Sequence, residues 1–307
     1  MAPPVDYAFR FLQYLDLMLL FGVPLYAWYA RAALRHAGLD STYPPGAPLR
    51  ILLLVAGLLG VGLLALEVVR APAAILGLSA SELVLDDFRW YLLDTAAGRA
   101  TLVRLVALLL VVWTLAGHRL VRSALPVRRV SLFAGIALAT LAWNGHAAAG
   151  DGAAGSARLV AGVVHLLAAG AWLGAIAALL GLLVTRHAAA GRETKSLLHA
   201  FALPGSLIVG LLAASGAFHY AELLGWSGTM LFEGSYGRLM ALKLALFGAM
   251  LVLAALHRWW LVPRLDWKEF GPVRPRRRLQ WSIGMEGLGA LLIVLIVSVL
   301  GLLSPYQ

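Results

Sequence analysis

Apolar residues along this chain gather into eight runs, which are separated by shorter stretches rich in charged residues, proline and glycine. The runs cover about residues 11–35, 50–70, 99–117, 130–147, 159–185, 198–220, 237–262 and 281–303. Each approaches the roughly 20 residues with which a helix crosses the hydrocarbon core of a bilayer. The pattern therefore predicts an all-α, polytopic transmembrane helical bundle of about eight spans, with residues 1–307 forming a single transmembrane domain.

Basic residues mark alternate loops between these runs. They follow the first, third, fifth and seventh runs, whereas the intervening loops are acidic or nearly free of charge. Lysine and arginine are enriched in cytoplasmic loops. The basic loops, including 186–197 and 263–280, are therefore predicted to be cytoplasmic, and both termini are predicted to be periplasmic.

The longest loop on the predicted outer side covers residues 71–98. Its segment LSASELVLDDFRWYLLDTAAGR combines acidic residues with apolar residues at helical spacing. This spacing is typical of a short amphipathic helix that lies at the membrane interface. We therefore expect an interfacial helix in this loop.

Composition supports a membrane protein and excludes several kinds of site. Hydrophobic residues make up 61% of the chain and charged residues 13%, about half of the roughly 25% usual in soluble domains. The net charge of +10 is concentrated in loops between apolar runs, which argues against nucleic acid as a partner. The absence of cysteine excludes disulfides and thiolate metal sites. A metal must therefore be bound by histidine, methionine, carboxylate or backbone oxygen.

Three histidines fall near one predicted depth in consecutive spans. His146 ends the fourth span, His165 lies about two turns inside the fifth, and His219 lies near the end of the sixth. Imidazole is the commonest metal ligand in proteins, and it suits copper. Thioether sulfur is a soft ligand, so Met240 or Met230 could join them. The sequence predicts a metal site at the outer ends of spans four to six.

Charged residues within the spans are expensive in lipid and each requires a reason. Asp16, Glu67, Arg104 and Lys243 lie inside the apolar runs. By depth, Asp16 and Glu67 are the nearest partners for Lys243, whereas Arg104 either points inward or extends towards the interface. These residues either hold the bundle in one arrangement or line an ion path.

Small residues indicate where spans five and six approach other helices closely. Gly170 and Gly174 form a G-x-x-x-G pair, and Gly210 with Ala214 forms a second small pair. Close packing of these two spans would bring His165 and His219 together. Trp172 lies seven residues after His165, on the same helix face, where it could border the site.

Several segments resemble the copper-resistance membrane protein family called CopD or PcoD. The resemblance is carried by NGHAAAG (144–150), VHLLAAGAWLGAI (164–176), EGSYGRLMALKLALFGAMLVLAALHRWWLVPRL (233–265) and FRFLQYLDLMLLFGVPLY (9–26). It implies an inner-membrane protein that handles copper together with a periplasmic copper carrier of the CopC type. The family's conserved histidines would correspond to His146 and His165, while Tyr236, Gly237, Arg238 and Lys243 match its motif in span seven.

Two positions depart from the family pattern, which commonly has asparagine where His219 and His257 stand. This departure weakens His219 as a ligand of the whole family, although His219 could add a ligand in this chain.

Three functions fit these features. The leading one is copper transport or uptake from a periplasmic carrier through His146, His165 and His219, by a transporter or copper-binding protein rather than an enzyme. The chain lacks the G-x-x-x-x-G-K-[ST] motif of an ATP-driven pump. The alternative is electron transfer through haem b held by pairs of the same histidines. The third is a scaffold subunit whose histidines only form hydrogen bonds.

Overall fold

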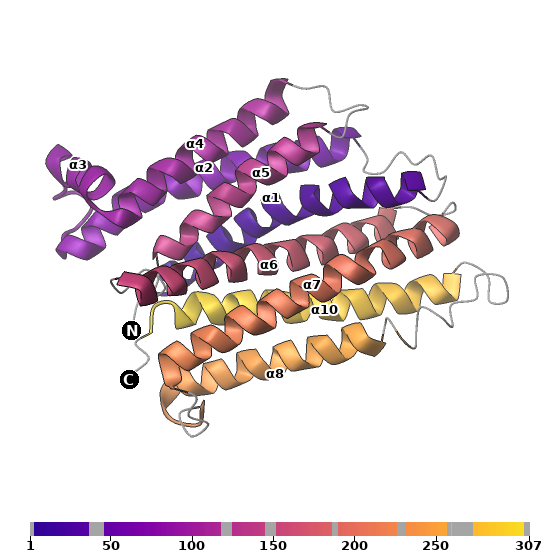
Figure 1. Cartoon of the computed structure of the whole chain (residues 1–307). Coiled ribbons are helices and arrows are strands. Elements are labelled where there is room, and N and C mark those ends of the chain that lie inside the picture. Colours follow the sequence, from indigo (N-terminus) through magenta and orange to yellow (C-terminus); the bar gives the residue numbers. More distant parts are fainter. Residues whose placement is uncertain are drawn as a thin grey trace.

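The computed structural model describes residues 3–36, 46–117, 125–144, 152–185, 190–225, 231–256, 259 and 273–303. Within these ranges the protein is helical and contains no strand, which confirms the all-α prediction (Figure 1). The elements are α1 (Pro4–His36), α2 (Gly46–Leu76), α3 (Leu85–Asp94), α4 (Ala96–Gly117), α5 (Leu125–Ala139), the 3₁₀ helix η1 (Thr140–Asn144), α6 (Gly152–Thr185), α7 (Ala190–Leu224), α8 (Gly234–Leu256) and α10 (Val273–Leu300).

Seven of the described helices are long and apolar enough to cross a membrane. They are α1, α2, α4, α6, α7, α8 and α10. The fourth predicted span is formed by α5 and η1, which follow one another between α4 and α6 and run back along the bundle (Figure 1). The start of α1 and the end of α10 lie together, because Nη1 of Arg10 donates to the carbonyl of Gly301 at 2.6 Å. α5 and η1 are not among the seven, so the eighth crossing and the periplasmic location of both termini stay predictions.

Several helices are longer than the spans predicted from the apolar runs. α7 begins at Ala190 and α10 at Val273, so helix occupies part of both basic segments, 186–197 and 263–280, that were predicted as loops. The physical reason is that arginine, lysine and glutamate are good helix formers, which lets a helix continue beyond the apolar core of the bilayer. The cytoplasmic location of these segments stays a prediction.

The outer segment 71–98 contains the expected short helix, α3. The backbone N–H of Val84 donates to the Asp87 carboxylate at 2.9 Å, which satisfies an otherwise unpaired group at the start of the helix. At the other end, the Thr95 hydroxyl donates to the Tyr91 carbonyl and accepts from the N–H of Gly98. α3 buries Tyr91 and exposes Leu85 and Leu93. Its location at the membrane interface stays a prediction.

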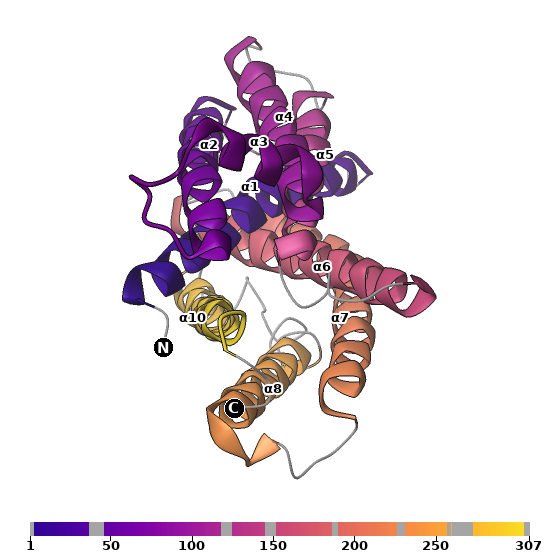
Figure 2. The ribbon, with the colours of Figure 1, turned by 90° about the vertical axis from the view of Figure 1, so that its left-hand side faces the viewer.

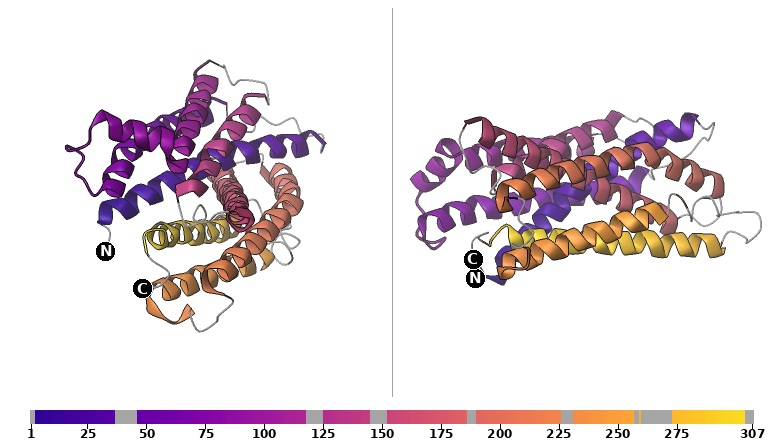
Figure 3. Two further views of the ribbon diagram at one scale, coloured as in Figure 1. Left: turned by 60° about the vertical axis from the view of Figure 1, so that its left-hand side comes forward. Right: turned by 60° about the horizontal axis from the view of Figure 1, so that its bottom comes forward.

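The α1 and α6 helices touch through their backbones near the middle of the bundle. A Cβ atom added to Gly22 would overlap the backbone of Gly170, and one added to Gly174 would overlap the backbone of Gly22. The G-x-x-x-G pair of α6 therefore faces α1, and the expectation that it draws α6 towards α7 is wrong. Figure 2 shows the two groups of helices that this contact joins, with α2, α4 and α5 on one side and α7, α8 and α10 on the other. Figure 3 shows α8 and α10 side by side.

We expect Gly174→Ala to lower stability, because its methyl group forces α1 and α6 apart. Overpacking of this kind costs about 1–3 kcal/mol. The measurement is the thermal unfolding of the protein purified in detergent. Gly181→Ala is the matched control, because it lies in the same helix and an added Cβ there meets nothing within 4 Å. Equal unfolding temperatures for the two variants would contradict the close contact.

Candidate functional site

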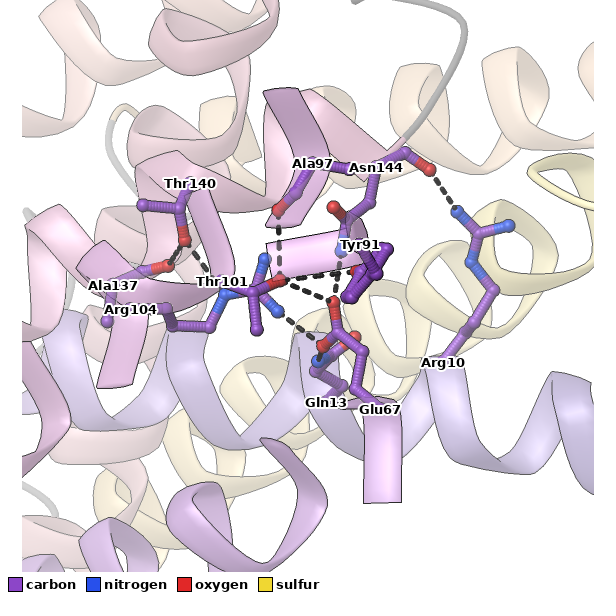
Figure 4. A network of polar contacts seen from close by, with 10 residues as sticks. All are labelled: Arg10, Gln13, Glu67, Tyr91, Ala97, Thr101, Arg104, Ala137, Thr140 and Asn144. Carbon is purple, nitrogen blue, oxygen red and sulfur yellow. Dashed lines mark hydrogen bonds and ion pairs between the residues drawn. The ribbon is translucent and has the colours of Figure 1, made fainter. Parts of the chain in front are cut away.

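The described residues form two groups of polar side chains inside the bundle. We call the first the histidine site, which consists of His165 in α6, Ser215 and His219 in α7, and Lys243 in α8. We call the second the arginine cluster, which consists of Arg10, Gln13, Glu67, Tyr91, Thr101, Arg104, Thr140 and Asn144 (Figure 4). Each group joins helices that are far apart in the sequence.

The histidine site forms where α6 meets α7. Ser215 and His219 are four residues apart, so they lie on one face of α7. That face meets His165, whose ring centroid lies 6.1 Å from that of His219, with the two rings nearly perpendicular. The predicted approach of these two histidines is therefore found, although the glycine pair that suggested it faces α1.

Ser215 fixes the proton arrangement of His165. Its hydroxyl lies 2.5 Å from the Leu211 carbonyl and 2.9 Å from Nδ1 of His165. A serine hydroxyl has one hydrogen. Because this hydrogen is donated to Leu211, the serine oxygen accepts a hydrogen bond from Nδ1–H of His165. The remaining ring nitrogen, Nε2, then carries a lone pair, as a metal ligand requires.

The His219 ring is held in a similar way and lies in a charged neighbourhood. It forms a hydrogen bond with the Ala161 backbone of α6, one turn before His165. Lys243 interacts electrostatically with both histidines, and Glu222 with His219. Glu222 also forms an ion pair with Arg158 at 3.4 Å. The two imidazoles are thus oriented by backbone and hydroxyl groups, and the Lys243 side chain is near enough to interact with them.

The other predicted ligands are placed differently. His146 and Met230 lie outside the described residues. Met240 is buried with Tyr236 in an apolar cluster that includes Ile296 and Leu300 of α10. Within the described part of the chain, no three histidine and carboxylate side chains lie close enough to hold one metal ion. The structure places two of the predicted ligands, His165 and His219, side by side, and their role as metal ligands stays a prediction.

Trp172 lies on the α6 face that continues from His165. It is buried, and its ring meets Phe247 of α8 edge-on with centroids 5.7 Å apart. This contact, together with Lys243, ties α8 to the face of α6 that bears the histidine. The predicted role of Trp172 at the border of the histidine site stays a prediction.

An ion pair between Glu67 of α2 and Arg104 of α4 forms the centre of the arginine cluster. Nη1 of Arg104 donates to Oε2 of Glu67 at 2.5 Å, and Nε of Arg104 donates to the Thr140 hydroxyl at 2.8 Å (Figure 4). Arg104 is fully buried, so its inward orientation is the correct one of the two predicted. Glu67 also accepts hydrogen bonds from Gln13 and from Nδ2 of Asn144.

The cluster extends towards the end of the bundle where α1 begins. Nη2 of Arg10 donates to the Asn144 carbonyl at 3.3 Å. Thr101 lies 3.4 Å from both Glu67 and the Tyr91 hydroxyl. Burial raises the pKa of the Tyr91 hydroxyl, and the hydrogen bond with Thr101 partly offsets this effect. These bonds attach α3 and η1 to the ion pair.

The predicted partnership of Lys243 is wrong. Glu67 pairs with Arg104, and Lys243 lies beside His165 and His219. Depth alone could not separate these arrangements, because it does not specify which helices are neighbours. Asp16 remains buried, and its Oδ2 atom has no hydrogen-bond partner among the described residues.

Two family models match most of the chain. The model for "Copper resistance protein D-like, N-terminal domain" matches residues 1–157, and the model for "Copper resistance protein D" matches residues 195–300. Copper resistance protein D from Pseudomonas syringae pv. tomato is 33% identical over 313 residues, which cover 99% of this chain and 98% of that protein. The chain belongs to the copper resistance protein D family. This membership confirms the resemblance found in the sequence.

A second relative of this CopD-family chain is "Inner membrane protein YebZ" of Escherichia coli (strain K12). It is 27% identical over 170 residues, which cover 54% of this chain and 56% of YebZ. No solved structure matches the chain. Family membership and the seven membrane-crossing helices make the chain a copper-related, multi-pass membrane protein, in agreement with the predicted inner-membrane location.

Sequence reasoning missed the residues that form hydrogen bonds with the buried charged side chains and with His165. Ser215 precedes His219 by one turn, and this spacing could have indicated a shared role. Gln13, Thr140 and Asn144 carry no comparable signal, because single amides and hydroxyls are common in membrane helices. Their role depends on how α1, α2, α4 and η1 pack in this CopD-family chain.

We expect Arg104→Met to be strongly destabilising, because it leaves the Glu67 carboxylate buried without its counter-charge. Breaking a buried ion pair in this way costs about 3–5 kcal/mol. The measurement is thermal unfolding in detergent, with Arg89→Met as control, since Arg89 forms only an exposed 4.0 Å pair with Asp86. The double variant Arg104→Met/Glu67→Gln should lose less stability than the sum of the single losses. Additive losses would show that the pair is not coupled.

Proposed function

We propose that this protein moves copper across the inner membrane, or takes it up from a periplasmic carrier, by way of His165 and His219. Copper is the cargo in this reading. His146, Met230 and Met240 are candidate additional ligands on the same predicted outer side. Asp16, Glu67, Arg104, Lys243, Trp172 and Tyr236 are the candidates that line an ion path or hold the bundle.

The main support for this proposal is the hydrogen bonding of the two imidazole rings. Nδ1 of His165 is engaged by Ser215, and His219 is engaged by the Ala161 backbone. Each ring therefore has its second nitrogen available as a ligand. The centroid separation of 6.1 Å is on the scale of two metal–nitrogen bonds of about 2 Å each plus the ring radii.

Lys243 favours release over permanent binding. When Lys243 carries its proton, its ammonium group repels a cation held by the neighbouring imidazoles, so the site then binds copper less tightly than the same two ligands would alone. An ion path needs binding that is favourable enough for entry and weak enough for exit. Two imidazoles beside a lysine meet this requirement better than a closed cage of ligands.

The family relationship supports a periplasmic partner. The resemblance to CopD proteins implies a copper carrier of the CopC type, which would deliver the ion to the predicted outer end of the bundle. Arg158 and Glu222 lie near that end of α6 and α7, where their ion pair is partly exposed. Delivery at this end would bring copper to His219 and His165.

Haem b is the alternative that uses the same two histidines. It requires room for a flat macrocycle between the imidazole nitrogens, and it gives a visible spectrum that copper on imidazoles does not. A visible spectrum of the purified protein in its oxidised and reduced forms separates the two functions. A Soret band with sharp α and β bands after reduction would show that the protein binds haem, and electron transfer would then be the better proposal than copper passage.

We expect the double variant His165→Ala/His219→Ala to lose most of its copper, because both ligand nitrogens are removed. The first measurement is the copper content of the protein after incubation with copper and removal of unbound metal from the buffer. The second is copper uptake into proteoliposomes. His36→Ala is the control, because His36 is exposed at the end of α1. Unchanged copper content and unchanged uptake in the double variant would refute the proposed site.

Ser215→Ala should weaken copper binding without removing a ligand. Loss of a group that orients a metal ligand typically lowers affinity about 10–100-fold. The measurement is a copper titration of the purified protein with a competing chelator. Ser206→Ala is the matched control, because Ser206 also lies on α7 and also donates to the carbonyl four residues earlier, but it is exposed. Equal affinities in the two variants would contradict the role of Ser215.

A further inference from the structure

Asp16 is a deeply buried carboxylate that does not belong to the histidine site and is not proposed to bind copper. Its side chain lies in α1 where that helix meets α2 and α4. A Cβ atom added to Gly60 would lie 2.9 Å from Oδ2 of Asp16 and 3.1 Å from Cδ2 of Leu108, so the carboxylate is held between Gly60 and an apolar side chain. Only 6% of Asp16 is exposed, and Oδ2 has no hydrogen-bond partner among the described residues.

A charged carboxylate in this position would be costly. An unpaired ion inside a membrane protein carries a penalty of several kcal/mol, which it avoids by binding a proton or a counter-ion. Glu67 does not face this problem, since it accepts hydrogen bonds from Arg104, Gln13 and Asn144. The two carboxylates therefore differ: Glu67 forms an ion pair with Arg104, whereas no ion pair to Asp16 is found among the described residues.

Along α1 and α4, the arginine cluster lies about one helical turn from Asp16. Gln13 precedes Asp16 by three residues in α1, and Arg104 precedes Leu108 by four in α4, so both lie about one 5.4 Å turn towards the start of α1. Nη2 of Arg104 is also buried and has no partner among the described residues. An unpartnered carboxylate oxygen and an unpartnered guanidinium nitrogen thus lie in the same region of the bundle.

A hydrogen-bonded route leads from the end of the bundle to this region. Arg10 is half-buried and contacts the Asn144 carbonyl, and the Asn144 amide contacts Glu67. Glu67 in turn contacts Gln13 and Arg104 (Figure 4). These hydrogen bonds end at Gln13 and Arg104, and Oδ2 of Asp16 has no partner among the described residues.

We propose that Asp16 is a membrane-embedded proton-binding site, about one helical turn along α1 from the arginine cluster. One proton from water adds to the Asp16 carboxylate and yields a neutral carboxyl group. The total charge of Asp16, Glu67 and Arg104 then changes from −1 to 0. When Asp16 releases the proton, Nη2 of Arg104 is the cationic group available to its carboxylate.

A test of this assignment must distinguish Asp16 from the other ionisable groups on the helices around α1. α2 contributes Glu67, α4 contributes Arg104, and α10 contributes Glu286, which is also buried. His165 of α6 lies on the face that meets Ser215 of α7. Arg128 and Arg129 of α5 are exposed near the start of that helix. Three buried carboxyl groups, on three different helices, therefore have to be distinguished within the described spans.

The test is infrared difference spectroscopy of the purified protein across a pH titration, in H₂O and D₂O, without copper. A protonated carboxyl group gives a C=O stretching band that shifts in D₂O, whereas a carboxylate does not. We expect this band in the wild type at neutral pH, its loss in Asp16→Asn, and its retention in Glu286→Gln. The amide variants preserve side-chain shape, and each is first checked for a single symmetric elution peak.

Two outcomes would overturn the assignment. One is a wild-type protein without any protonated carboxyl band at neutral pH, a result that needs no variant. The other is a band that disappears in Glu286→Gln and persists in Asp16→Asn. Because copper is absent from these measurements, they fail or succeed independently of the copper proposal.

Glu67→Gln tests the link to Arg104. Without Glu67, the guanidinium group has Asp16 as the remaining carboxylate near it. The Asp16 band should therefore weaken at neutral pH and reappear only at lower pH. An unchanged band in the folded variant would show that Arg104 does not serve as the counter-charge of Asp16.

Discussion

The backbone contact between α1 and α6 is the constraint on which the rest of the structure depends. Gly22, Gly170 and Gly174 lack the Cβ atoms that would separate these helices. In a membrane, where lipid is as apolar as leucine, close packing of small residues is a main source of helix association. This contact positions both polar groups, because α1 carries Gln13 and Asp16 while α6 carries His165.

The same contact connects the two regions matched by the family models. Residues 1–157 contain the arginine cluster, and residues 195–300 contain Ser215, His219 and Lys243. His165 lies between these regions, on a helix that packs against α1 on one side and α7 on the other. The histidine site therefore depends on α6 as the link between the two parts of the bundle.

Sequence periodicity and length predict the helices well, because lipid imposes a minimum length of apolar helix. It is harder to predict which helices pack against one another, as Lys243 illustrates. Its depth matches Asp16 and Glu67, but depth gives only one coordinate, and neighbouring helices are decided by close packing at particular glycines. The G-x-x-x-G pair shows the same limit, since its spacing correctly indicates close approach but does not identify α1 as the partner. The histidine pair is predictable because both residues lie near the same end of consecutive helices.

Copper binding at the histidine site and proton release at Asp16 would change the charge inside the bundle in opposite directions. A cation at His165 and His219 adds positive charge beside Lys243, whereas proton release at Asp16 adds negative charge across α6. If roughly one helix diameter, about 10–12 Å, separates these charges, their interaction at an effective dielectric constant of about 20 is around 1.5 kcal/mol. That energy corresponds to about a tenfold change in an equilibrium constant. A proton leaving Asp16 would therefore favour cation entry by electrostatics alone, while the α1–α6 contact keeps the distance between the two charges fixed.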